Sequence, residues 1–264
     1  MTETIISPQN EKIKQLVKLN KHRVRQKNGL TIIDGEREIK MALANHWPLQ
    51  EIFYCPELVK SQDLLTTKTI LIPVSLKIFN LISQKENPDG YLAVAKIKNT
   101  ALEDLKLKPN PLLIILETVE KPGNLGAIIR TAAAGNIDAV IIADEQTDIY
   151  HPNVIRASQG NVFKVQTASA STPAIMAWLK KNKIKSYAAS TQAAKNYQEI
   201  DWQKASAIVL GTEAEGLSDQ WLTGADAAIK IPMQADLDSL NVSVSAAIIA
   251  YEALRQRDFV DIDA

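Results

Sequence analysis

The chain of 264 residues has one cysteine, few aromatic residues and no net charge at neutral pH. The single cysteine, Cys55, excludes an internal disulfide framework and a zinc site built from cysteines. Because it lies in the apolar run EIFYC, we expect it to be buried and inert. Thirty Lys and Arg residues balance thirty Asp and Glu residues, so the overall charge gives no indication of nucleic-acid binding.

Long apolar runs, low-complexity segments and internal repeats are also missing. No run approaches the roughly 18 apolar residues that a membrane helix needs. The opening residues MTETIISPQN lack the charged segment and apolar core of a secretory signal, so we expect a cytoplasmic protein. An apolar content of 46% is typical of a folded chain, and the length fits one large or two ordinary domains.

Basic residues are nevertheless concentrated near the amino terminus, whereas the last residues are acidic. Seven Lys and Arg residues lie between Lys12 and Lys27. A helix predicted from Ser7-Pro8 to about Lys21 places apolar side chains on one face and basic ones on the other. Such a stripe favours a phosphate-backbone partner, with a solvated helix face as the alternative. The candidate RNA-binding residues of this stripe are Lys18, Arg23 and Arg25.

Two series of alternating strands and helices divide the chain. Residues 1–96 contain four predicted strands with helices between them, including a short helix over residues 56–65, which indicates a small α/β domain. Residues 97–110 mix charged residues without a sustained period, so we assign them to a linker. Residues 111–264 begin with the apolar strand PLLIIL, as expected where helices cover both faces of a parallel sheet.

The first motif, GNLGAIIRTAAAG at residues 123–135, places an arginine in an otherwise apolar predicted helix. The spacing of Gly123 and Gly126 does not match the dinucleotide fingerprint GxGxxG. An arginine there is costly to bury unless it meets an anion. Asn124 and Arg130 are therefore candidate site residues, and the alternative is a structural pair between Arg130 and a carboxylate.

The second motif, LGTEAEGLS at residues 210–218, follows directly from a predicted strand. Gly211 lets the backbone approach a ligand closely. Glu213 lies at the carboxyl end of the strand, where open α/β sheets bind ligands. The alternative is a turn with an exposed carboxylate.

The third motif, IPMQADLDSLN at residues 231–241, is a polar loop before a helix of small and β-branched residues. We expect this helix to be packed on several sides. Ser239 and Asn241 are candidates for its N-cap. The free N–H groups and the positive dipole end of the helix would suit a polar ligand.

In this order, the three motifs resemble those of the SpoU, or TrmH-like, branch of the SPOUT RNA methyltransferases. The segment RASQGNVF, from Arg156 to Phe163, resembles the stretch between the first two motifs and adds Arg156 to the RNA-binding candidates. Residues 1–96 are similar to the L30e-like substrate-binding domain of many members. The resemblance implies an α/β fold whose C-terminal domain is a deep trefoil knot, one of the few exceptions to unknotted topology. It also implies a homodimer formed through that domain, with each active site near the subunit interface.

The resemblance implies transfer of a methyl group from S-adenosylmethionine to a ribose 2′-hydroxyl, with ribosomal RNA preferred and no metal. A tRNA 2′-O-methyltransferase and a non-catalytic RNA-binding factor are the alternatives. The implied cofactor-binding residues are Gly211, Thr212, Ile231, Met233 and Leu240. The implied catalytic residues are Asn124, Arg130, Glu213, Ser239 and Asn241.

The ribose hydroxyl is a poor nucleophile that needs alignment and help in losing its proton. None of the three histidines lies in a motif. The family-based proposal uses Arg130 beside an RNA phosphate, and because an arginine side chain keeps its proton at neutral pH, we favour positioning and charge stabilisation over a role as base. Family members commonly carry glycine where this chain has Ala235, and Asp236 and Asp238 follow. We expect this departure to affect cofactor affinity more than fold.

Overall fold

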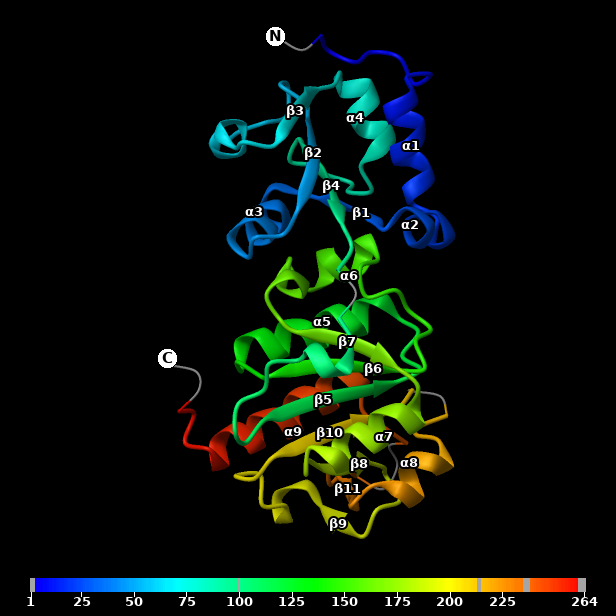
Figure 1. Cartoon of the computed structure of the whole chain (residues 1–264), viewed down its shortest axis with the longest axis vertical. Helices are drawn as coiled ribbons and strands as arrows, with labels where there is room; N and C mark the ends of the chain where they lie inside the picture. Colours follow the sequence, from blue (N-terminus) through cyan, green and yellow to red (C-terminus); the bar gives the residue numbers. More distant parts are fainter. Residues whose placement is uncertain (1–2, 99, 213–214, 235–237, 261–264) are drawn as a thin grey trace. The chain divides into compact units, whose positions relative to one another are not determined.

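A computed structural model describes residues 3–98, 100–212, 215–234 and 238–260 (Figure 1). These residues form two compact units. Unit 1 joins the described residues up to Lys98 with Asp148–Lys164, and unit 2 contains the rest. Among the described residues, no helix is both long and apolar enough to cross a membrane.

Unit 1 contains a mixed sheet of four strands in the order β1-β4-β2-β3. Strand β4 is antiparallel to β1 and β2, whereas β2 and β3 are parallel. On one face of this sheet, Ile32, Phe53, Ile72, Leu92 and Val94 are buried in one apolar cluster with the helices. The strands are β1 (Leu30–Asp34), β2 (Leu49–Tyr54), β3 (Ile70–Pro73) and β4 (Tyr91–Lys96).

The helices of unit 1 bury one side each against this sheet. Residues of α1 and α4 share one apolar cluster with the strands, and α3 contacts β1 and β4. Buried Cys55 belongs to the same cluster, as expected. The helices of this part are α1 (Glu11–Leu19), α2 (His22–Asn28), α3 (Glu36–Ala44), the 3₁₀ turn η1 (Asp63–Thr66) and α4 (Leu76–Ile82).

Two secondary-structure predictions for unit 1 were wrong. The first helix begins at Glu11 rather than at Pro8, because the side chain of Asn10 accepts a hydrogen bond from Lys12 N (3.0 Å) and caps it. No α-helix forms over residues 56–65. The only helical turn there is the 3₁₀ turn at Asp63–Thr66, and the hydroxyl of Tyr91 donates to the carbonyl of Ser61 (2.6 Å), which precedes that turn.

Residues 148–164, which we call the inserted segment, leave the chain of unit 2 and pack on unit 1. The segment contains α6 (Pro152–Ala157), which lies along the edge strand β1, and the 3₁₀ turn η3 (Asn161–Phe163). Thr31 Oγ1 donates to the carbonyl of Tyr150 (2.6 Å). The ring of Trp47 packs against Tyr150 and Phe163, with centroids 5.5 and 5.1 Å apart. Sequence analysis did not predict this helix or its packing.

Arg25 connects the inserted segment to α2 through a buried ion pair. Its side chain is fully buried, and Nε donates to Asp148 Oδ2 (2.8 Å). Nη1 donates to the carbonyls of Leu19 and Asn20, both at 2.9 Å. The expectation that Arg25 lies on the exposed basic stripe and contacts RNA was therefore wrong, because its charge is used inside unit 1.

The start of α6 depends on a neutral histidine. His151 Nδ1 accepts a hydrogen bond from Asn153 N (3.1 Å) and caps the helix. Burial lowers the pKa of His151 below its usual 6.5, and the nearby Arg25 charge lowers it further. The imidazole is therefore deprotonated at pH 7, as an acceptor at Nδ1 requires.

Unit 2 contains a fully parallel sheet of seven strands in the order β7-β6-β5-β10-β8-β11-β9. The central strands β5, β6 and β10 are buried along their whole length, as the apolar run PLLIIL predicted. The strands are β5 (Leu112–Glu117), β6 (Ala139–Ala143), β7 (Thr167–Ala170), β8 (Lys185–Ala189), β9 (Lys195–Asn196), β10 (Ser206–Leu210) and β11 (Ala227–Lys230).

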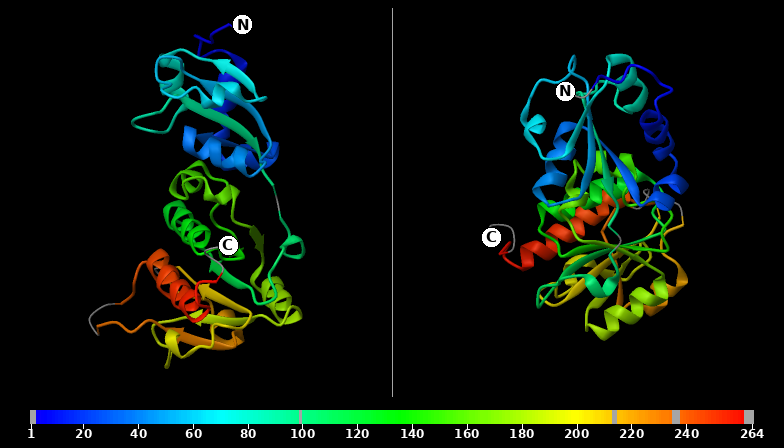
Figure 2. Two further views of the ribbon diagram at one scale, coloured as in Figure 1. Left: turned by 90° about the vertical axis from the view of Figure 1, so that its left-hand side faces the viewer. Right: turned by 45° about the horizontal axis from the view of Figure 1, so that its top comes forward.

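Helices cover both faces of this sheet, which confirms the predicted α/β class. Helices α5 (Pro122–Ala134) and α9 (Val242–Gln256) pack together on one face, and α7 (Thr172–Lys181) and α8 (Asp219–Gly224) lie on the other (Figures 1 and 2). Two 3₁₀ turns, η2 (Leu102–Asp104) and η4 (Tyr197–Glu199), complete the described elements of the unit.

Residues 100–110, which the sequence assigned to a linker, pack with unit 2. The side chains of Leu102 and Leu105 are buried in the core between the sheet and α7. The amide side chain of Gln166 exchanges hydrogen bonds with the backbone of Lys106 (2.9 and 2.8 Å). The predicted boundaries at residues 96 and 111 stay predictions, and the structure adds that the described part of the linker is ordered by these contacts.

Replacement of Asp148 by asparagine should destabilise unit 1. The change leaves the Arg25 guanidinium buried without its counter-charge, and loss of one partner of such a pair costs about 3–5 kcal/mol. Urea unfolding followed by circular dichroism measures the change in the free energy of unfolding. Asp201→Asn is the control, because its ion pair with Lys204 is exposed on the surface. Equal stability of the two variants would contradict the structural role of Arg25.

Candidate functional site

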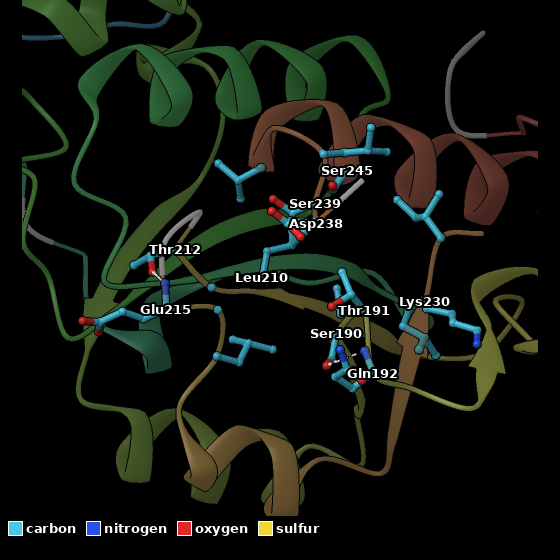
Figure 3. A pocket seen from close by; sticks show the side chains of 18 of the residues that line it. Ser190, Thr191, Gln192, Leu210, Thr212, Glu215, Lys230, Asp238, Ser239 and Ser245 are labelled. Carbon is cyan, nitrogen blue, oxygen red and sulfur yellow. Dashed lines mark hydrogen bonds between the residues drawn. The ribbon is translucent and has the colours of Figure 1, made fainter. Parts of the chain in front are cut away.

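A cavity of about 430 Å³ opens at the carboxyl ends of β8, β10 and β11 in unit 2 (Figure 3). Loops that follow parallel strands meet at this edge, which is where open α/β sheets hold ligands. The cavity is lined by all five residues that the sequence proposed for the cofactor, namely Gly211, Thr212, Ile231, Met233 and Leu240. The second and third motifs therefore form one site.

The loop that follows β10 turns back on itself beside the cavity. Thr212 and Gly216 exchange two backbone hydrogen bonds, at 3.0 and 3.1 Å, and Gly216 has a φ of +71°. A Cβ added to Gly211 would lie 2.0 Å from the carbonyl oxygen of Gly216. We expected Gly211 to allow close approach of a ligand, whereas the structure shows close approach of its own chain. Glu213 lies outside the described residues.

The third motif caps α9 and contacts the first motif. Asn241, not Ser239, is the N-cap, because its Oδ1 accepts hydrogen bonds from Ser243 N (3.0 Å) and Ser243 Oγ (2.6 Å). Asn241 Nδ2 donates to Asn124 Oδ1 (3.2 Å), so the starts of α9 and α5 are linked through two candidate catalytic residues. Ser239 instead lines the cavity, as Figure 3 shows. Ala235 and Asp236 lie outside the described residues.

Arg130 is exposed on α5. It follows Asn124 by six positions, so at about 3.6 residues per turn the two side chains leave the helix roughly 120° apart. Within the described part of the chain, Arg130 forms no ion pair, which does not support the alternative of a structural pair with a carboxylate. The burial expected from its apolar neighbours was also wrong, because α5 presents Arg130 on a solvent-facing side. The structure therefore does not bring Arg130 together with Asn124.

The site contains polar residues that sequence analysis missed. Ser190, Thr191 and Gln192 follow β8 and line the cavity across from Asp238 and Ser239 (Figure 3). Lys230, Glu215 and Ser245 also contribute to the lining. A polar run after the strand SYAA was a usable signal, because its carboxyl end lies at the same edge as β10. Among the described residues, no group of His, Cys, Asp and Glu side chains could hold a metal ion.

The lining combines three chemical types. Leu210, Leu217 and Val242 provide apolar surface, whereas hydroxyl and amide groups provide hydrogen-bond partners. Glu215 and Asp238 add two negative charges, which outnumber the one positive charge of Lys230. Such a cavity suits a ligand of intermediate size with a flat or apolar part, several hydroxyl or amino groups and a positive charge.

Replacement of Gly211 by alanine should disrupt the cavity. The added Cβ would meet the backbone of Gly216, which is not the end of a flexible side chain, so the loop itself must move. We expect binding of S-adenosylmethionine, the cofactor implied by the sequence motifs, to weaken at least about tenfold in a calorimetric titration. Gly123→Ala is the matched control, because a Cβ there has no atom within 4 Å. Unchanged affinity of the Gly211 variant would contradict the placement of the cofactor.

Comparison with known proteins agrees with this geometry. Residues 111–251 match the SpoU rRNA Methylase family, and residues 10–93 match the MRM3-like substrate binding domain. The chain is 30% identical over 247 residues to a 23S rRNA (guanosine(2553)-2′-O)-methyltransferase of Bacillus subtilis, a match that covers 94% of this chain and 97% of the relative.

Solved structures are similar over nearly the whole chain. One is a crystal structure of an RNA 2′-O ribose methyltransferase, with a TM-score of 0.86, 36% identity and coverage of 97% of this chain and 99% of the other. Another is the SpoU methyltransferase AviRb of Streptomyces viridochromogenes in complex with AdoMet, with a TM-score of 0.88, 25% identity and coverage of 95% and 99%. The chain therefore belongs to the SpoU rRNA methylase family and has the SPOUT fold with its trefoil knot.

Proposed function

We propose that this chain transfers a methyl group from S-adenosylmethionine to a ribose 2′-hydroxyl of ribosomal RNA. The observation that carries the proposal is the cavity at the carboxyl ends of β8, β10 and β11, where the second and third family motifs meet. Two of the relatives described above are named as RNA 2′-O-methyltransferases, and the B. subtilis protein is named for 23S rRNA, which favours ribosomal RNA over tRNA. We propose that the reaction takes place in the cytoplasm, as the sequence led us to expect.

The cavity fits S-adenosylmethionine. Its volume of about 430 Å³ lies within the range of small-molecule sites, and the ligand has an adenine, a ribose with two hydroxyls and a charged methionine part. Ser190, Thr191 and Gln192 supply partners for hydroxyl and ring nitrogen groups. Glu215 and Asp238 favour the positive charges of an amine and a sulfonium. When bound, the cofactor supplies a methyl group on positively charged sulfur.

The residues around the cavity would hold and align the ribose. The hydrogen bond between Asn241 and Asn124 fixes the start of α9 against α5, and so fixes one wall of the cavity. Ser239 shapes the adjoining wall. The proposed role of Arg130 is to bind an RNA phosphate next to the target ribose and to stabilise charge as the hydroxyl loses its proton. The proposed role of Glu213 is to orient this arrangement by charge-assisted hydrogen bonds.

The RNA surface that we propose lies on unit 1. Lys18 and Arg23 are exposed on α1 and α2, and Arg156 is exposed on α6 of the inserted segment. None of the three forms an ion pair with another described residue, so their charges are available to phosphates. The match of residues 10–93 to a substrate binding domain supports the same assignment.

We also propose that the protein is a homodimer formed through α5 and α9. The prediction that α9 is packed on several sides was wrong for the single chain, because Val244 and Tyr251 are 46% and 43% exposed. These residues lie seven positions apart on one face of the helix. The exposed side of α5 beside it carries small residues and Arg130. A partner packed on this surface would place each Arg130 near the subunit interface.

A methylation assay tests the function directly. The purified protein, labelled S-adenosylmethionine and ribosomal RNA or large subunits from a strain lacking the gene should give one labelled ribose, located by mass spectrometry of RNA fragments. Arg130→Ala should bind RNA nearly as wild type but lower the transfer rate by about 10²-fold or more, because it removes charge stabilisation in the transition state.

Two variants control this assay. Lys180→Ala removes an exposed charge on α7, on the opposite face of the sheet, and should leave transfer unchanged. Lys18→Ala combined with Arg23→Ala should weaken RNA binding and reduce its salt dependence without changing cofactor affinity. Transfer by Arg130→Ala at the wild-type rate would overturn the proposed mechanism, and absence of transfer to any RNA by the wild type would favour a non-catalytic binder.

The dimer is tested by sedimentation velocity. Val244→Asp should shift the protein to a monomer, because a buried unpaired carboxylate at an apolar interface is costly. Transfer activity should fall with dimer content. Ile70→Asp is the control, because Ile70 is 61% exposed on the edge strand β3 of unit 1 and does not belong to α5 or α9, which form the proposed interface. A wild-type monomer, or a Val244→Asp dimer, would contradict the interface.

A further inference from the structure

Glu117 is a buried carboxylate that the proposed mechanism does not use. It is the last residue of β5, and its exposed fraction is 5%. Oε2 accepts a hydrogen bond from Ser218 N (2.7 Å), and Oε1 accepts from Ser218 Oγ (2.6 Å) and Thr172 Oγ1 (3.4 Å). It forms no ion pair with another described residue. Three donors from two different segments therefore hold one buried negative charge.

The position of Ser218 gives these bonds a consequence for the cavity. Ser218 directly follows Leu217, the last cavity-lining residue of the loop that starts at Gly211. Strand β5 is paired with β10, with Leu116 opposite Leu210, so Glu117 lies beside the point where this loop begins. The loop thus leaves the sheet next to Glu117 and returns to the same carboxylate. Glu117 is not itself among the lining residues.

Glu117 is the polar anchor at the far end of the loop. Elsewhere in the loop, Thr212 and Gly216 exchange backbone hydrogen bonds, Glu215 N donates to Thr212 Oγ1 (3.0 Å), and Leu217 packs in the core. The backbone pair closes the turn on itself but does not attach it to the sheet. Packing of Leu217 is not directional, whereas a carboxylate that accepts from both Ser218 N–H and Ser218 O–H fixes the chain direction.

A buried carboxylate at this position also carries a cost in free energy. Burial of a charge is unfavourable unless it is fully hydrogen-bonded, and an apolar residue could complete the strand without that cost. The bonds to Ser218 are short, as charge-assisted bonds are, and they offset the desolvation of Glu117. Removal of the charge would therefore loosen the attachment of the loop more than it would disturb the sheet.

We propose that Glu117 is a positioning residue for the cofactor: it acts through Ser218 to hold the cavity wall formed by Gly211, Thr212 and the described residues 215–217, without touching the ligand. This inference rests on the proposed function, because the ligand of that wall is taken to be S-adenosylmethionine. Glu117 therefore keeps this wall ordered before the ligand binds. When Glu117 is lost, binding must also order the wall, and the affinity for the ligand falls.

The test is a calorimetric titration of full-length protein with S-adenosylmethionine. Glu117→Gln keeps the size of the side chain but removes the charge, and its amide group can place a donor against the donors of Ser218. We expect the dissociation constant to rise about tenfold, with the KM for the cofactor raised similarly and the rate at saturating cofactor changed by less than about threefold.

Asp138→Asn is the matched control. Asp138 is a carboxylate that is 8% exposed and accepts from Lys108 N (3.1 Å) and Leu112 N (3.0 Å). It fastens a loop to the same sheet, but at the amino end of β5, opposite the cavity. We expect this variant to lose stability to a similar extent as Glu117→Gln while its affinity for S-adenosylmethionine stays at the wild-type value. An equal loss of affinity in both variants would show that Glu117 acts only through general stability and would overturn the proposal.

The outcomes separate this inference from the proposed function. Wild-type protein that does not bind S-adenosylmethionine would contradict the function itself. Wild-type binding together with unchanged binding by Glu117→Gln would contradict only the role of Glu117. If Glu117→Gln does not fold, Ser218→Ala tests the proposal instead. It removes the hydrogen bond from the Ser218 hydroxyl to Glu117 but keeps the one from the backbone N–H. Its dissociation constant should rise about threefold, and no rise would overturn the proposal.

Discussion

The contact between Gly211 and the carbonyl of Gly216 is the constraint on which the whole site depends. Because position 211 has no side chain, the chain can turn back beside the end of β10 and still leave room for a cavity. The cavity wall is then completed from two other directions, by the residues after β8 and by the loop that leads to Asn241. A single methyl group at this point would bring the returning chain into collision with itself.

Unit 1 depends on a different kind of constraint, a buried charge. The guanidinium of Arg25 donates from Nη1 to the carbonyls at the end of α1 and from Nε to Asp148 of a distant segment. Since neither charge could be buried alone, the inserted segment and the amino-terminal helices must be present together. The ring contacts of Trp47 with Tyr150 and Phe163 then hold the inserted segment at a second point.

The sequence was sufficient for the fold class and for the family because both rest on local patterns. Uninterrupted apolar strands indicate a parallel sheet with two covered faces. The three motifs follow predicted strands, so they can be located without knowledge of the loop conformations. The structure was needed wherever a distant contact decides the outcome. The burial of Arg25 depends on Asp148, which lies 123 positions away in the sequence and which no local period reveals. The cap of α9 is local, because Asn241 accepts from Ser243, but the sequence left both Ser239 and Asn241 open as the first residue. Glu117 was overlooked because one acidic residue at the end of an apolar strand resembles an ordinary strand terminus.

The inserted segment also bears on the order in which the protein can fold during its synthesis. Asp148–Lys164 is made after two strands of unit 2, β5 and β6, yet it packs with the first 98 residues. When the amino-terminal residues leave the ribosome, the edge strand β1 has no α6 beside it and Arg25 has no counter-ion. Unit 1 cannot be completed until the first strands of unit 2 and the inserted segment have been translated. We therefore expect the two units to finish folding together rather than one after the other.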